Sequence, residues 1–284
     1  MPNVFSIDVE DWFHLLDSEQ APAYSRWNEL ESRVRPNTEQ LLKELAQRDI
    51  KCTFFILGWV AKQHPGLVGD IAAAGHEIAS HGYQHTLIYT QTPEEFRDDL
   101  RRANDAIHAA TDVVPTGFRA PGFSIIPKNV WAFDIVREEG FIYDSSVFPA
   151  IRSHGGLPGN EPRPSVLPNG LYEFPVSTTE IGSVRCGYLG GGYLRLIPKY
   201  LLFRWAKQQL AAGDPLILYL HPRDIDPAQP RMKLPPHRYF RTYVGLNHCL
   251  DKVNALLDEF DWTSFDEYLR VSPPKPKERL NAAA

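Results

Sequence analysis

Short apolar runs alternate with amphipathic stretches along the first half of the chain, and this alternation constrains the fold more than any other feature. The apolar runs, each long enough for one strand, lie at residues 4–7, 52–57, 77–80, 116–118 and 141–143. Between them, apolar residues recur at helical spacing over 37–48, 67–71, 93–107 and 128–139. Strands that alternate with helices in this way build parallel sheets or barrels. We therefore predict an α/β fold.

The second half of the chain is less regular. Residues 153–170 are rich in Gly and Pro and predict a long loop, of a kind that often shapes binding sites. Helices are expected over 198–212 and 247–260, with a strand at 216–220 between them. No linker divides the chain, so we predict one domain over 1–271, with the principal motifs in 4–222, an extension in 223–271 and a disordered tail at 272–284.

The composition excludes several classes of protein. With 43% hydrophobic and 23% charged residues, the chain is typical of a globular protein with a sizeable core. A net charge of −5 argues against a nucleic-acid partner, and the three widely spaced cysteines fit neither a disulfide framework nor a C-x-x-C zinc site. The N-terminal residues do not read as a signal peptide, and no apolar stretch of about 18 residues follows. We expect a cytoplasmic protein without an integral membrane segment.

Five ionisable residues each follow directly after a predicted strand, namely Asp8, His81, Arg119, Asp144 and His221. The C-terminal ends of the strands in a parallel barrel share one rim, so these side chains are expected to meet in one cleft. Each residue alone has an ordinary structural explanation. Their joint placement is therefore what predicts an active site.

A metal site is predicted from two histidines and a group of acids. His81 and His85 are four residues apart, a spacing that one turn or a tight loop can bring onto one ion, although such pairs are more often solvated or capping histidines. Asp8, Glu10 and Asp11 could cap the next element or supply a carboxylate ligand. Two histidines and one carboxylate leave an open coordination position, which is typical of a catalytic site.

Two further residues have candidate roles in proton transfer. His221 suits a general acid, because an imidazole near its usual pKa can protonate a leaving amine. Arg119 could hold a carboxylate in its ionised form or brace a loop, and the residues alone favour neither. Trp12, Tyr83 and Tyr193 could stack on sugar rings or belong to the core.

Five segments resemble the motifs of the NodB-homology polysaccharide deacetylases, carbohydrate esterase family four. In chain order they are Ser6-Ile-Asp8-Val-Glu10-Asp11, Ser80-His81-Gly-Tyr-Gln-His85, Phe118-Arg119-Ala-Pro121-Gly122, Tyr143-Asp144-Ser145-Ser146 and Leu218-Tyr-Leu-His221-Pro222. The segments Gly190-Gly-Gly-Tyr-Leu-Arg195 and Phe240-Arg-Thr-Tyr-Val resemble the branch encoded with bacterial exopolysaccharide export systems. That branch carries a C-terminal extension.

The resemblance implies a distorted (β/α)7 barrel, a divalent metal that is usually zinc, and deacetylation of an N-acetylated saccharide. It also implies association with the exopolysaccharide biosynthesis machinery. The implied roles are general base for Asp8, general acid for His221, metal ligands for Glu10, His81 and His85, contact with the base for Arg119, and tuning of the acid for Asp144.

The chain departs from the family pattern at two positions. Val9 follows Asp8 where most members have a second aspartate, so the carboxylate ligand is Glu10 or, alternatively, Asp11. Phe123 stands where glycine is common. Two other functions are considered, an amidase acting on a small cyclic amide and an inactive carbohydrate-binding barrel. The intact histidines and carboxylates favour the deacetylase over both.

Overall fold

The computed structural model describes residues 2–16, 18–152 and 155–275, and its centre is a curled, nine-stranded sheet. The strand order is β10-β1-β2-β3-β4-β5-β7-β6, and β11 pairs with β1. The strands are β1 (Asn3–Val9), β2 (Thr53–Ile56), β3 (Glu77–Ser80), β4 (Gly117–Phe118), β5 (Tyr143–Asp144), β6 (Ser165–Val166), β7 (Tyr172–Glu173), β10 (Ile217–Leu220) and β11 (Trp262–Thr263). Neighbours from β10 to β7 pair in parallel, so the predicted α/β fold is confirmed.

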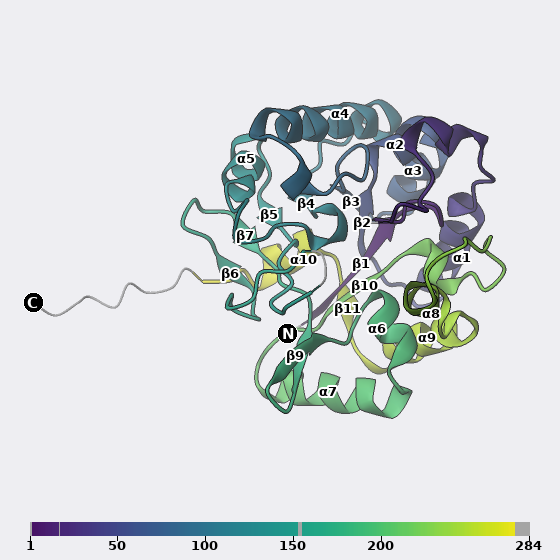
Figure 1. Ribbon diagram of the computed structural model, residues 1–284. Coiled ribbons are helices and arrows are strands. Elements are labelled where there is room, and N and C mark those ends of the chain that lie inside the picture. Colours follow the sequence, from purple (N-terminus) through teal and green to yellow (C-terminus); the bar gives the residue numbers. More distant parts are fainter. Residues whose placement is uncertain (1, 17, 153–154, 276–284) are drawn as a thin grey trace, which may run out of the picture.

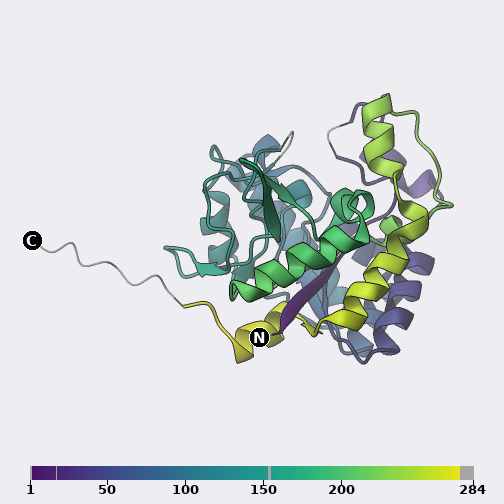
Figure 2. The same cartoon turned by 90° about the horizontal axis from the view of Figure 1, so that it is seen from below.

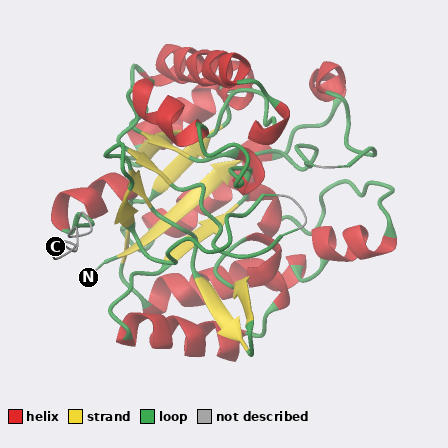
Figure 3. Cartoon of the chain, turned by 60° about the vertical axis from the view of Figure 1, so that its left-hand side comes forward, coloured by secondary structure: helices red, strands yellow, loops and turns green. Residues whose placement is uncertain are grey.

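Helices surround this sheet (Figure 3). The helices of the first half are α1 (Val34–Ala46), α2 (Gly58–Gln63), α3 (Pro65–Ala73), α4 (Pro93–Thr111) and α5 (Ala132–Glu138). Figure 1 shows α4 along one edge of the molecule and α7 (Lys199–Ala211) along the opposite edge, with the strands between them. The helix α4 starts at the capping box that the sequence Thr92-Pro-Glu-Glu95 predicts, and its buried face is Phe96, Leu100, Ala103 and Ile107.

The second half of the chain contains short elements that its sequence pattern does not reveal. They are α6 (Gly191–Leu196), α8 (Pro236–Tyr243), α10 (Phe265–Val271) and a hairpin of β8 (Thr178–Ile181) and β9 (Val184–Gly187). The predicted long loop at 153–170 contains β6, which pairs antiparallel with β7. Of the predicted tail, residues 276–284 lie outside the described residues.

The two ends of the described chain meet at the sheet. The strand β11 pairs with β1, and Figure 2 shows α10, coloured yellow, beside the N-terminal end of β1. The expected helix over 247–260 is α9 (Cys249–Glu259). No helix among the described residues combines the length and the apolar character needed to cross a bilayer.

The sheet register brings the C-terminal ends of the strands to one rim. Ile7 pairs with Leu220, Ser80 with Phe118, and Phe118 with Asp144. The strand β1 is buried along its whole length and lies between β2 and β10, so Asp8, one residue before its end, projects into the interior of the rim.

Candidate active site

A carboxylate and two imidazoles meet at the end of β1. The Glu10 Oε1 atom lies 3.1 Å from Nε2 of His81 and 2.8 Å from Nε2 of His85, and all three residues are buried. Their ligand atoms lie within 4.8 Å of one another, close enough for one metal ion. The structure therefore brings together the two histidines and the acid that the sequence suggests as ligands.

The chemistry of these donors fits a cation. The Nδ1 atom of His81 lies 2.7 Å from the carbonyl oxygen of Arg119, which places the ring proton on Nδ1 and leaves the Nε2 lone pair facing Glu10. The Nε2 atom of His85 is buried and, although it lies 2.8 Å from Glu10 Oε1, no described residue forms a hydrogen bond of suitable geometry with it. His85 also has a φ of 54°, in the left-handed region that histidine enters more often than most residues.

The charges of this cluster also suit metal binding. Burial opposes the negative charge of Glu10, but His85, His221 and His81 outweigh burial and hold the pKa of Glu10 well below its usual value. Burial lowers the pKa of His85, which favours the neutral form of its ring. An ionised carboxylate and neutral imidazoles are the protonation states that bind a metal.

Asp11 points away from this cluster. Its carboxylate accepts hydrogen bonds from the backbone N–H groups of Trp12, Arg33 and Val34 and from the Ser32 hydroxyl, at 2.6 to 3.3 Å. These contacts tie it to the N-terminal end of α1, where the unpaired N–H groups of a helix favour a carboxylate. Of the two alternatives kept from the sequence, Glu10 faces the histidines and Asp11 does not.

Arg119 contacts Asp8 in the interior of the rim. Its Nη1 atom donates to Asp8 Oδ1 at 2.6 Å and to the Ser6 hydroxyl at 2.9 Å, and the arginine is fully buried. Its other nitrogens donate to the carbonyl and hydroxyl of Ser145, and its guanidinium lies 4.1 Å from the ring centre of Phe55. Of the two roles left open by the sequence, these contacts favour pairing with a carboxylate.

His221 faces both carboxylates from the end of β10. Its Nε2 atom lies 3.9 Å from Asp8 Oδ2 and 3.7 Å from Glu10 Oε1. Its Nδ1 atom lies 2.8 Å from Asp224 Oδ2, and Asp224 also accepts from the backbone N–H of His221. Burial opposes the charged ring, but Glu10 and Asp224 outweigh burial and raise the pKa of His221.

A buried arginine holds Asp224 in place. The Nε atom of Arg195, in α6, lies 3.0 Å from Asp224 Oδ1. The remaining nitrogens of Arg195 donate to the carbonyls of Arg241, Thr242 and Val244 at the C-terminal end of α8, at 2.8 to 3.1 Å. Imidazole, carboxylate and guanidinium therefore form one chain of contacts that joins α8 to the rim.

The position of Asp144 differs from the expectation that it tunes the acid. Its carboxylate accepts from the backbone N–H and the hydroxyl of Ser146, at 2.8 and 2.6 Å, and it interacts electrostatically with Glu173. Burial raises the pKa of Asp144, and burial together with the charge of Asp144 raises the pKa of Glu173. The carboxylate that contacts His221 is Asp224, because the turn after β10 folds back onto the imidazole.

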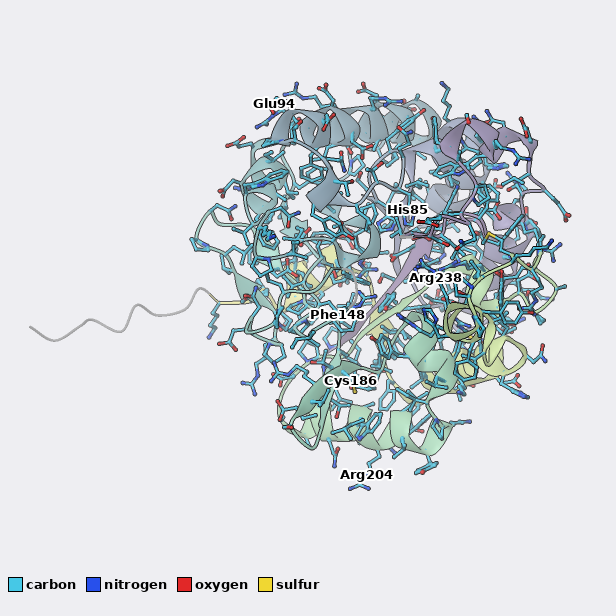
Figure 4. The ribbon with its side chains drawn as sticks, viewed as in Figure 1. His85, Glu94, Phe148, Cys186, Arg204 and Arg238 are labelled. Carbon is cyan, nitrogen blue, oxygen red and sulfur yellow. The ribbon has the colours of Figure 1, made fainter. Side chains whose placement is uncertain are left out.

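A cavity of 560 Å³ opens above these residues. Asp8, Glu10, His85 and His221 line its floor, and residues of α6 and α8 line its wall. Figure 4 shows His85 near the centre of the molecule and Arg238, from α8, close by. Tyr193 lines this cavity, whereas Trp12 and Tyr83 are buried, so of the three aromatic residues only Tyr193 is placed to meet a ligand there.

Phe123, which stands where the family often has glycine, adopts a backbone conformation that is typical of glycine. Phe123 has a φ of 55°, which glycine adopts more easily. Its buried ring packs 5.0 Å from the ring of Tyr219 and 5.7 Å from that of Phe148, and this packing offsets the strain. Gly122, beside it, also has a positive φ and lines the cavity.

The sequence reasoning missed Asp224, Arg195, His14 and Arg223, all of which contact or line the site. A signal for Asp224 exists, since an acid three residues after His221 can reach back to its backbone N–H as in a capping box. Arg195 gives no local signal, because its partners lie far away in the sequence.

Comparison with known proteins agrees with this geometry. Residues 24–137 match the family model described as polysaccharide deacetylase, and residues 145–270 match a domain of unknown function, DUF3473. A peptidoglycan-N-acetylglucosamine deacetylase of Bacillus cereus is 30% identical over 96 residues, 34% of this chain and 35% of the relative. A chitooligosaccharide deacetylase of Rhizobium leguminosarum bv. trifolii is 37% identical over 73 residues, 26% of this chain and 34% of the relative.

Solved structures share the fold over nearly the whole chain. A Mycobacterium smegmatis protein assigned as a polysaccharide deacetylase has a TM-score of 0.64 at 22% identity, covering 99% of this chain and 94% of that chain. An allantoinase has a TM-score of 0.58 at 16% identity, covering 96% and 91%. A CE4 family pseudoenzyme of Bacillus anthracis has a TM-score of 0.50 at 16% identity, covering 94% and 64%.

The fold and the site define a barrel of the deacetylase type. Residues 24–137 match the polysaccharide deacetylase family that the motifs predict, and the fold agrees with that match. The matched segments span only about a third of the two curated relatives. Membership of the exopolysaccharide branch is untested and stays a prediction.

Proposed function

We propose that this protein is a metal-dependent deacetylase that removes N-acetyl groups from an amino-sugar-containing saccharide. The observation that carries the proposal is the approach of His81 and His85 to Glu10, with Asp8 and His221 beside them. The names of the relatives support it, because they describe deacetylases of N-acetylglucosamine-containing material. The same fold carries an allantoinase and a pseudoenzyme, so the fold alone would not decide the activity.

Glu10, His81 and His85 would hold the metal, and two imidazole nitrogens with one carboxylate oxygen favour zinc. A bound divalent cation would polarise the acetyl carbonyl and lower the pKa of a bound water.

Asp8 acts as the general base in this proposal. Arg119 donates a hydrogen bond to the Oδ1 atom of Asp8, so Oδ2 is the oxygen that can take a proton from the attacking water. Attack gives a tetrahedral oxyanion, for which a backbone N–H near Gly122, at the cavity wall, is a candidate donor. Loss of one such donor costs about 3 kcal/mol in other hydrolases.

His221 acts as the general acid. Asp224 binds its Nδ1–H, so the Nε2–H is directed toward Asp8 and Glu10 and can protonate the departing amine. The raised pKa of His221 supports this role, because it favours the protonated ring that a general acid needs. The products are acetate and a free amino sugar.

The test is acetate release from a panel of N-acetylated oligosaccharides and nucleotide sugars, with zinc, without zinc and after chelation. We expect acetate from at least one saccharide, loss of activity with chelator, and no activity in Asp8→Asn. Hydrolysis of a small cyclic amide without acetate release would instead identify an amidase. Absence of both activities and of stoichiometric metal would identify an inactive barrel.

Three further statements stay predictions from the sequence. They are the single domain over 1–271, the cytoplasmic location and the association with exopolysaccharide biosynthesis machinery.

A further inference from the structure

Two residues beside the active site, His14 and Arg223, carry buried donors that have no hydrogen-bond partner among the described residues. The first belongs to His14, which is 1% exposed and lies shortly after β1. Its Nδ1 atom accepts a hydrogen bond from the backbone N–H of Asp11 at 3.0 Å, so the ring proton is on Nε2. That Nε2–H is buried and makes no hydrogen bond within the part of the chain that the structure describes.

The second set of donors belongs to Arg223. This residue follows His221 by two positions, in the turn that carries Asp224. Its Nε and Nη1 atoms are both shielded from solvent, and no described residue is a hydrogen-bond partner of either. Proteins rarely leave guanidinium donors in this condition, because the loss of hydration is not compensated.

Both residues line the cavity that contains the acid and the proposed metal ligands. The only carboxylates among the described residues of its lining are Asp8 and Glu10, which already face Arg119 and the histidines. The lining also includes Arg152 and Arg241, so the wall above the acidic floor is basic. An N-acetyl group is neutral and gives no reason for this excess of cationic donors.

We propose that His14 and Arg223 form a subsite for an anionic group, a carboxylate or a phosphate, that the N-acetylated saccharide carries close to its acetamido group. The Nε and Nη1 groups of the guanidinium can each donate to an oxygen of either anion, and the His14 Nε2–H adds a third donor. This inference rests on the proposed function for the identity of the substrate, but not for the binding of the anion.

The test compares three probes that differ in charge. They are neutral chitotetraose, a tetrasaccharide of alternating N-acetylglucosamine and glucuronate, and N-acetylglucosamine 1-phosphate. We expect kcat/KM for acetate release to favour at least one anionic probe over the neutral one by about ten-fold or more, the size of one charge-assisted hydrogen bond. Whether carboxylate or phosphate is preferred identifies the source of the anion.

Substitutions then assign the preference to these residues. Arg223→Gln is expected to reduce the anionic-to-neutral ratio about ten-fold, and His14→Phe to reduce it in the same direction while keeping an aromatic ring beside Phe13, Trp27 and Trp59. Arg204→Gln is the matched control, because Arg204 is exposed on α7 and lies at the outer edge of the molecule (Figure 4). Circular dichroism shows that each variant is folded.

A binding measurement separates this inference from the proposed function. Calorimetry with metal-free protein should detect N-acetylglucosamine 1-phosphate or the glucuronate tetrasaccharide, with weaker binding to Arg223→Gln. Anion binding without acetate release from any probe would keep the subsite and reject the deacetylase. Equal use of neutral and anionic probes, or a preference that both folded variants retain, would overturn the subsite and leave the deacetylase intact.

Discussion

Arg119→Met is the substitution whose effect follows most directly from the structure. The methionine keeps an apolar contact with the Phe55 ring but leaves the Asp8 carboxylate, which is 2% exposed, without its 2.6 Å partner. Removal of one partner of a buried ion pair typically costs about 3–5 kcal/mol, because a buried charge is left uncompensated. We expect a loss of this size in the free energy of unfolding, together with loss of acetate release.

Urea unfolding of the chelator-treated protein measures this effect without a contribution from bound metal. The double variant Asp8→Asn/Arg119→Met removes the buried charge as well, so it should recover about 2 kcal/mol or more relative to Arg119→Met alone. Both Arg119→Met and the double variant should be inactive in acetate release. A loss below about 1 kcal/mol in Arg119→Met, or a double variant as unstable as the sum of the singles, would refute the reasoning.

Three further predictions concern metal, pH and stability. His81→Ala and His85→Ala should each abolish stoichiometric divalent metal by elemental analysis, whereas the control His248→Ala, at an exposed position, should not. Asp224→Asn should lower the pKa of His221 and move the alkaline limb of kcat/KM to lower pH, and an unmoved limb would contradict the contact between them. Burial raises the pKa of Glu77 from 4.5 to about 7, so the folded protein holds a proton that the unfolded chain releases and stability falls as pH rises through this window. Glu77→Gln removes that titration. Between pH 4.5 and 8, its free energy of unfolding in urea should therefore fall by about 3 kcal/mol less than that of the wild type. Parallel plots of unfolding free energy against pH for the two proteins would contradict this prediction.

Elements with local signals were predictable from the sequence. The strand over 77–80 has the predicted bounds, and α4 starts at its capping box, because hydrophobic period and capping chemistry act within one segment. The helices α6 and α8 were not predicted. Arg195 of α6 binds three carbonyls at the end of α8, and such partners distant in sequence leave no periodic pattern.

Only part of the candidate site could be predicted from the sequence. Asp8, His81 and His221 could be placed at one rim because strand ends converge in a parallel barrel. Asp144 was assigned by motif order, but its side chain turns to Ser146 and Glu173, and that direction depends on the local turn. The unpartnered donors of His14 and Arg223 become visible only when the packing around them is known.

The position of β1 between β2 and β10 sets an order of events during synthesis. Ser6 donates its hydroxyl to the carbonyl of Leu218, 212 residues further along the chain. The emerging polypeptide thus holds Glu10, His81 and His85 long before it holds His221. A ribosome-bound chain could capture a cation early, yet it would have no proton donor until β10 emerges and docks, so hydrolysis would wait for the last quarter of the molecule.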